Sequence, residues 1–154
     1  MPGMLIILGF LAVAAMVGAQ RQILIPPLAE DSAQTFAASF RALAHASVAY
    51  AEANPGATGT IAPASLAPYL DPYVPPAQAS AQITNGLLVV SAQPPGQAGT
   101  VQWVAHNLAA TYGDVAYGYV AGGQMVSAAG GVLGTPPAGV TNGEAIYVIV
   151  RPTS

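Results

Sequence analysis

Charged residues are scarce in this sequence, and cysteine and lysine are absent altogether. Only 6% of its 154 residues are charged and its three basic residues are all Arg, whereas an ordinary soluble domain is roughly a quarter charged. The absence of Cys excludes disulfides, zinc-thiolate sites and Cys nucleophiles, and the absence of Lys excludes a P-loop lysine. Three scattered arginines cannot form the basic surface of a nucleic-acid-binding protein, so nucleic acid is excluded as a partner.

Apolar and turn-forming residues are abundant instead. Hydrophobic residues make up 53% of the chain, which also has 17 Gly and 14 Pro. Disordered chains combine high charge with low hydrophobicity, so this composition predicts a folded domain with a buried core and many turns. Because few charges remain to keep the surface soluble, we expect a membrane or other subunits to cover part of it, which leaves room for a homo-oligomer.

The first 25 residues contain a long apolar segment. Residues 1–19 carry no charged side chain, and residues 4–19 would span about 24 Å as a helix at roughly 1.5 Å per residue. Arg21 interrupts the run before residues 23–25 resume it, and its side chain can extend to the membrane interface. We therefore predict a transmembrane anchor at residues 1–25, followed by a single domain at 26–154. The alternative is a signal peptide cleaved after Ala19, because small residues stand at 17–19.

A long amphipathic helix is predicted directly after this segment. Residues 28–53 contain no Gly or Pro, and larger side chains recur at spacings of three and four. This predicted face consists of Phe36, Phe40, Leu43, Ser47 and Tyr50. Pro26-Pro27 suits a helix start, the acidic Glu30 and Asp31 favour a helix N-terminus, and Asn54-Pro55-Gly56 predicts its end.

The remainder is predicted to form a small antiparallel sheet. A Pro-rich connector at 57–78 holds a short helical turn near 63–70, and a second short helix covers 101–112. The predicted strands are 79–83, 87–92, 115–119, 124–128 and 145–150, with turns at Asn85-Gly86 and Gly122-Gly123. The last strand is rich in β-branched residues, which suits a central position. The fold class is therefore α+β: a membrane helix, an amphipathic helix and a sheet of four or five strands.

Residues that could perform chemistry are dispersed along the sequence. The acids are Glu30, Asp31, Glu52, Asp71, Asp114 and Glu144, and the histidines are His45 and His106. His106 could belong to a Ser/His/Asp catalytic triad, but the sequence contains no G-x-S-x-G motif. Metal sites need clusters of such residues, so we predict no catalytic residue, no metal and no cofactor. A small envelope hydrolase that uses two of the carboxylates remains an alternative.

Tyrosines are a further group with two interpretations. Tyr69 and Tyr73 lie in the connector, and Tyr112, Tyr117 and Tyr119 surround the predicted sheet. Tyr-rich surfaces form good protein interfaces, and the same residues could instead pack the sheet against the long helix.

Three tracts carry a family resemblance. They are FAASFRALAHASVAYAEANPG (36–56), GTIAPASLAPYLDPYVP (59–75) and NGEAIYVIV (142–150). With the apolar N-terminus, they resemble the PilM family of the type IVb thin-pilus systems of conjugative plasmids, and the overall plan resembles pilin-like proteins. The resemblance implies a non-enzymatic, single-pass protein of the bacterial inner membrane whose main domain lies in the periplasm. It also implies a role in pilus assembly, with other pilus-assembly proteins or pilin subunits as partners.

Two features depart from the prepilin pattern. Gly9-Phe10 resembles the prepilin cleavage point, but Ala14 stands where a prepilin has its Glu, and no short basic leader precedes it. We therefore expect an assembly protein or a pilin-like minor subunit rather than the major pilin. The alternative function is a secreted or periplasmic binding module with a cleaved signal peptide.

Overall fold

The computed structural model describes residues 27–96, 100–112 and 116–151, so the predicted anchor at 1–25 lies outside the described residues. The chain divides into two units, Met1–Glu30 and Asp31–Ser154, and the second holds the fold that follows. Among the helices described, none is long and apolar enough to cross a membrane.

The three described helices match the predicted ones. Helix α2 covers Pro27–Ala53, α3 covers Pro63–Leu70 and α4 covers Thr100–Tyr112. At the end of α2, the Asn54 backbone N–H makes an i→i−4 hydrogen bond to the Tyr50 carbonyl at 3.0 Å, and its side-chain Nδ2 donates to the same carbonyl at 2.9 Å. The next residue, Pro55, has no N–H with which to continue the helix. Glu30 and Asp31 lie near the start of α2, as predicted.

The described residues form a sheet of seven antiparallel strands, so the prediction of four or five was wrong. The strands are β1 (Gly59–Thr60), β2 (Ser80–Thr84), β3 (Leu87–Ala92), β4 (Tyr117–Ala121), β5 (Gln124–Ser127), β6 (Val132–Gly134) and β7 (Ala145–Val150). Their order is β1-β2-β3-β7-β4-β5-β6. Strands β1 and β6 were not predicted. They are two and three residues long and lie in segments whose Gly and Pro residues indicated loops. Strand β7 is central, as predicted.

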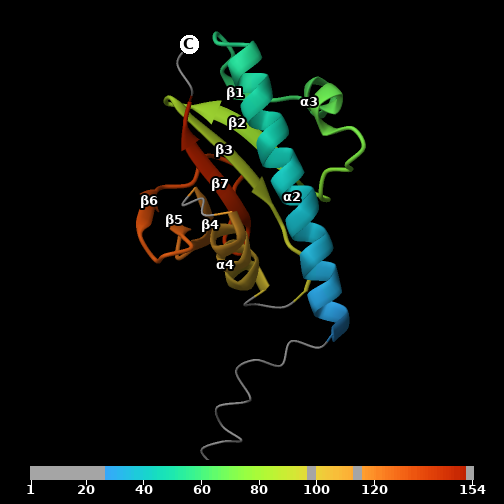
Figure 1. The fold of residues 1–154 in the computed structure, drawn as a ribbon. Coiled ribbons are helices and arrows are strands. Elements are labelled where there is room, and N and C mark those ends of the chain that lie inside the picture. The colour runs from blue at the N-terminus through green and yellow to red at the C-terminus, as the bar shows by residue number, and fades with distance from the viewer. Residues whose placement is uncertain (1–26, 97–99, 113–115, 152–154) are drawn as a thin grey trace, which may run out of the picture. The chain divides into compact units, whose positions relative to one another are not determined.

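Helix α2 crosses one face of the sheet, with α4 beside it (Figure 1). The main core lies beneath α2 and includes Phe40 and Leu43 from the helix with Leu88 and Val90 from β3. A smaller cluster on the other face contains Val89, Val120, Met125, Val140 and Ile146. Strand β3 is thus buried on both faces, which explains why its sequence begins with four apolar residues in a row, Leu87–Val90, rather than alternating.

Aromatic rings connect α2 to the middle of the sheet. Phe36 stacks on Phe40 at 5.7 Å between ring centroids, Phe40 meets the edge of Tyr117 at 6.3 Å, and Tyr117 meets Tyr147 at 4.9 Å. Tyr117 is 2% exposed. This residue therefore follows the packing interpretation of the tyrosines, in which they join the sheet to the helix.

Candidate interaction surface

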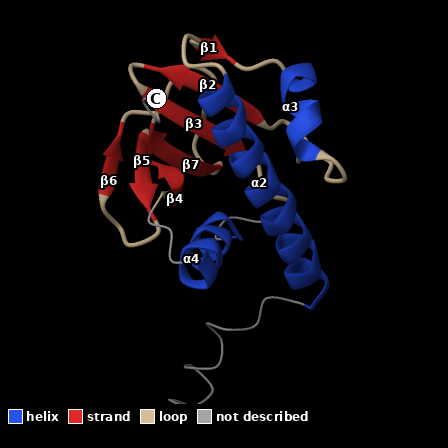
Figure 2. Cartoon of the chain, turned by 45° about the horizontal axis from the view of Figure 1, so that its top comes forward, coloured by secondary structure: helices blue, strands red, loops and turns tan. Residues whose placement is uncertain are grey.

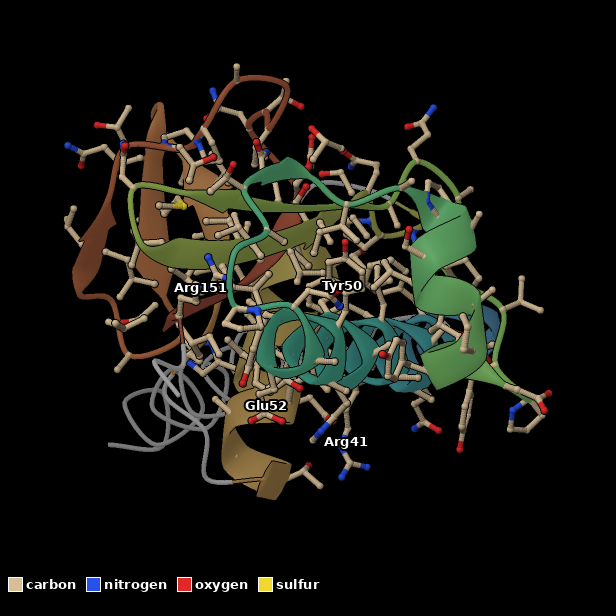
Figure 3. All side chains as sticks on the ribbon, turned by 90° about the horizontal axis from the view of Figure 1, so that it is seen from above. Arg41, Tyr50, Glu52 and Arg151 are labelled. Carbon is tan, nitrogen blue, oxygen red and sulfur yellow. The ribbon has the colours of Figure 1, made fainter. Side chains whose placement is uncertain are left out.

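The acidic and histidine residues that the sequence singled out are spread over α2, α4 and the segments that follow α3 and precede β7. His45 and Glu52 are exposed on α2, Asp71 is exposed after α3, and His106 is exposed on α4 with its Nδ1 3.2 Å from the Gln102 carbonyl oxygen. Figure 3 shows Glu52 projecting from the side of α2 that faces away from the sheet. Asp114 lies outside the described residues. In the described ranges, no three His, Asp or Glu residues gather closely enough to hold a metal ion.

Glu144 is a buried acid, and its contacts are local. Its Oε1 accepts hydrogen bonds from the Thr141 backbone N–H at 2.9 Å and from the Thr141 hydroxyl at 2.8 Å. The carboxylate therefore organises the turn before β7. Nearby, the Asn142 Oδ1 accepts a hydrogen bond from the Gly123 N–H at 2.9 Å, which ties this turn to the β4–β5 turn.

Arg151 joins the end of β7 to the end of α2. Its Nη1 donates to the Ala57 carbonyl at 2.7 Å and its Nη2 donates to the Asn54 carbonyl at 2.6 Å. These carbonyls belong to the turn where α2 ends, and a cation suits the negative end of a helix dipole. Figure 3 shows Arg151 beside that end of the helix. The residue therefore holds α2 against the end of β7.

A groove of about 740 Å³, hereafter the α2 groove, runs along the first half of α2. One wall is α2, through Ser32, Thr35, Phe36 and Ser39, and the others are residues 74–78 and 93–95. Its volume lies within the roughly 300–1,000 Å³ typical of ligand-binding sites. None of the described residues that line it carries a charged side chain.

The connector after α3 borders this groove. A smaller groove of about 280 Å³ lies between α2, α3 and β2, and it shares Pro75, Pro76 and Gln78 with the α2 groove. Tyr69, Tyr73 and Val74, near these prolines in the chain, are 42%, 55% and 76% exposed. Tyr69 and Tyr73 are thus exposed, unlike the buried Tyr117, and their interface interpretation stays a prediction. Tyr119 is half-buried, and the side chain of Tyr112 is outside the described part.

The sequence alone did not identify the α2 groove. Its walls come from three segments that the fold brings together, and the signal that could have indicated it is the pair of Pro-rich stretches, 72–76 and 94–95. Prolines in exposed positions present preformed extended backbone to a partner.

Comparisons with known proteins support one family. The chain is similar to the protein described as PilM from Escherichia coli B7A, whose crystal structure superimposes with a TM-score of 0.57 at 20% identity. That match covers 82% of this chain and 97% of the other and shows a shared fold. No curated protein matches the chain. The family model of PilM matches residues 4–148, nearly the whole sequence, and the chain therefore belongs to the PilM family, which is linked to pilus systems.

Proposed function

We propose that the chain is a non-enzymatic component of a type IV pilus assembly system, of the type IVb kind carried by conjugative plasmids. Residues 1–25 anchor it in the bacterial inner membrane, and residues 26–154 act in the periplasm as a docking domain for other pilus proteins. In its finer form, the proposal makes the chain a pilin-like minor subunit.

The observation that carries this proposal is the α2 groove in a PilM-family domain. It is large, and none of its described lining residues is charged. A groove of this kind binds through apolar contacts and through hydroxyl and amide groups. It supplies a surface for a protein partner.

Membrane fractionation of the full chain tests the location. We expect the protein to pellet with inner membranes, to resist extraction by high salt, and to dissolve in detergent. Leu11→Arg should release it, because a charge at the middle of a spanning helix costs about 2.5–3.5 kcal/mol, whereas the matched control Leu11→Ala should stay in the membrane. A wild-type protein recovered without membranes would contradict the proposal.

N-terminal sequencing separates the proposal from its alternative. A retained anchor leaves the original N-terminus, whereas a mature protein that begins at Gln20 would identify a secreted or periplasmic binding module. The assembly role is tested in cells: deletion of the gene should abolish pili, and the full-length gene should restore them. Restoration by Ala variants of Glu52 and Glu144 would argue against the hydrolase alternative.

A further inference from the structure

The chain contains two Asn-Gly dipeptides, which lie at opposite ends of β7. Asn85-Gly86 forms the turn between β2 and β3, and Asn142-Gly143 lies in the turn before β7. Because β3 and β7 are antiparallel, the first dipeptide lies beside the end of β7, whereas the second lies just before its start (Figure 2). A glycine that follows an asparagine favours loss of the side-chain amide, because it has no Cβ to hinder its main-chain nitrogen.

The reaction at such a dipeptide needs water and no other reagent. The glycine nitrogen gives up its proton and forms a bond to the Asn Cγ, while the Cγ–Nδ2 bond breaks and the amide nitrogen leaves as ammonia with that proton. Water then opens the resulting cyclic imide at one of its two carbonyls, which gives Asp or isoAsp. Both products carry a new carboxylate, and in isoAsp the main chain is longer by one methylene group.

Two hydrogen bonds hold Asn142-Gly143 away from this reaction. The Asn142 Oδ1 accepts a hydrogen bond from the Gly123 N–H at 2.9 Å, which fixes the side-chain amide on the β4–β5 turn. The Gly143 N–H donates to the Val120 carbonyl at 2.9 Å. The attacking nitrogen and the group that it would attack are thus bonded to different partners, and both bonds must open before the ring can close.

Asn85-Gly86 has neither of these restraints. Both residues are exposed, and no described residue bonds to the Asn85 side chain or accepts a hydrogen bond from the Gly86 N–H. Their φ angles of 52° and 75° are both positive, as a type I′ turn requires. The amide and the attacking nitrogen are therefore open to water in the folded chain.

The two other asparagines of the sequence lack a reactive neighbour. Asn54 precedes Pro55, whose nitrogen has no proton to give up. Asn107 lies within α4 and precedes Leu108, so the next main-chain nitrogen belongs to the helical hydrogen-bond ladder and carries a bulky side chain beside it. Asn85 is thus the position where sequence and fold both permit the reaction.

We propose that Asn85 is a self-modification site of the folded chain, where water converts its amide into Asp or isoAsp, whereas the fold protects Asn142. Either product places a negative charge in a turn of two residues, and isoAsp also lengthens that turn between the paired Thr84 and Leu87. The Gly86 carbonyl accepts a hydrogen bond from the Arg151 N–H at 2.8 Å, so the modified turn adjoins the residue that holds the end of α2. This inference does not depend on the proposed function.

Incubation in heavy-oxygen water tests the site. The full chain in neutral detergent is kept in mildly alkaline buffer, either folded or in concentrated urea, and is then digested with pepsin in acid for mass spectrometry. Each conversion takes up one solvent oxygen, which distinguishes it from earlier changes. In the folded chain, Asn142 should convert more than about tenfold more slowly than Asn85, because two hydrogen bonds must open first. In urea the two sites should convert at similar rates, because they share the same dipeptide.

Isoelectric focusing of the intact protein gives the matched control. The folded wild type should accumulate an acidic form with time, and so should Asn142→Gly. Asn85→Gly should accumulate none over the same period, since it lacks the amide and its glycine suits the positive φ. Equal conversion of both sites in the folded chain overturns the proposal, and so does an Asn85 that converts only in urea. An acidic form of Asn85→Gly that accumulates as fast as that of the wild type overturns it as well.

Discussion

Removal of the Arg151 side chain should detach the end of α2 from the end of β7. Arg151→Ala deletes two hydrogen bonds from a charged donor, at 2.7 and 2.6 Å. Such bonds contribute about 1.5–3 kcal/mol each. Because one bond is exposed and the other only partly buried, we expect each to contribute about 1.5 kcal/mol or less. With about 0.5 kcal/mol from the helix dipole, we expect a loss of about 2–3 kcal/mol in the free energy of unfolding.

Urea unfolding of the full chain in neutral detergent measures this loss. Trp103, the single tryptophan, lies on α4 and reports through its fluorescence. With a slope of about 2 kcal/mol per molar urea, the midpoint should fall by about 1–1.5 M. Arg151→Lys should lose about half as much, because a single ammonium group cannot span both carbonyls as the guanidinium does. The exposed neighbour Val150→Ala serves as the control, with a change within about 0.5 kcal/mol. An Arg151→Ala protein as stable as this control would refute the role given to Arg151.

Three further substitutions test the core and the turns by the same unfolding assay. Phe40→Ala, at a fully buried position, should cost about 3–5 kcal/mol, and a cost below about 1 kcal/mol would contradict its place in the core. Gly118→Ala should cost more than about 2 kcal/mol, because the added Cβ would overlap the Val126 carbonyl oxygen; a neutral effect would show that β4 and β5 separate easily. Glu144→Ala should cost about 1–3 kcal/mol by removing the acceptor of both Thr141 hydrogen bonds, and an unchanged midpoint would mean that water replaces the carboxylate.

Periodic and turn signals predicted most of the elements correctly. The apolar spacing at Phe36, Phe40 and Leu43 predicted both the extent of α2 and the face that it buries. Strand β7 followed from its many β-branched residues, and Asn85-Gly86 predicted the turn between β2 and β3. Each of these signals depends on neighbours in the sequence, which is why a single sequence was sufficient.

Features that join distant segments carried no comparable signal. Strand β6 has three residues within a Gly- and Pro-rich stretch, so only its pairing with β5 makes it a strand. Arg151 contacts Ala57 across 94 positions of the chain, and a lone Arg near a C-terminus indicates no particular partner. The α2 groove likewise forms where residues 32–39, 74–78 and 93–95 meet. Composition could indicate only that such a surface would lack charge.

The place of β7 in the sheet has a consequence for biogenesis. Of the described strands it is the last along the chain, yet it pairs with β3 along six residues and with β4 along three, and β3 and β4 have no other link through the described sheet. A nascent chain that lacks residues 145–150 holds two separate blocks of strands with unsatisfied edges. The described sheet can therefore close only after residues 145–150 have left the ribosome, and a truncation that removes this strand would leave an open, aggregation-prone intermediate.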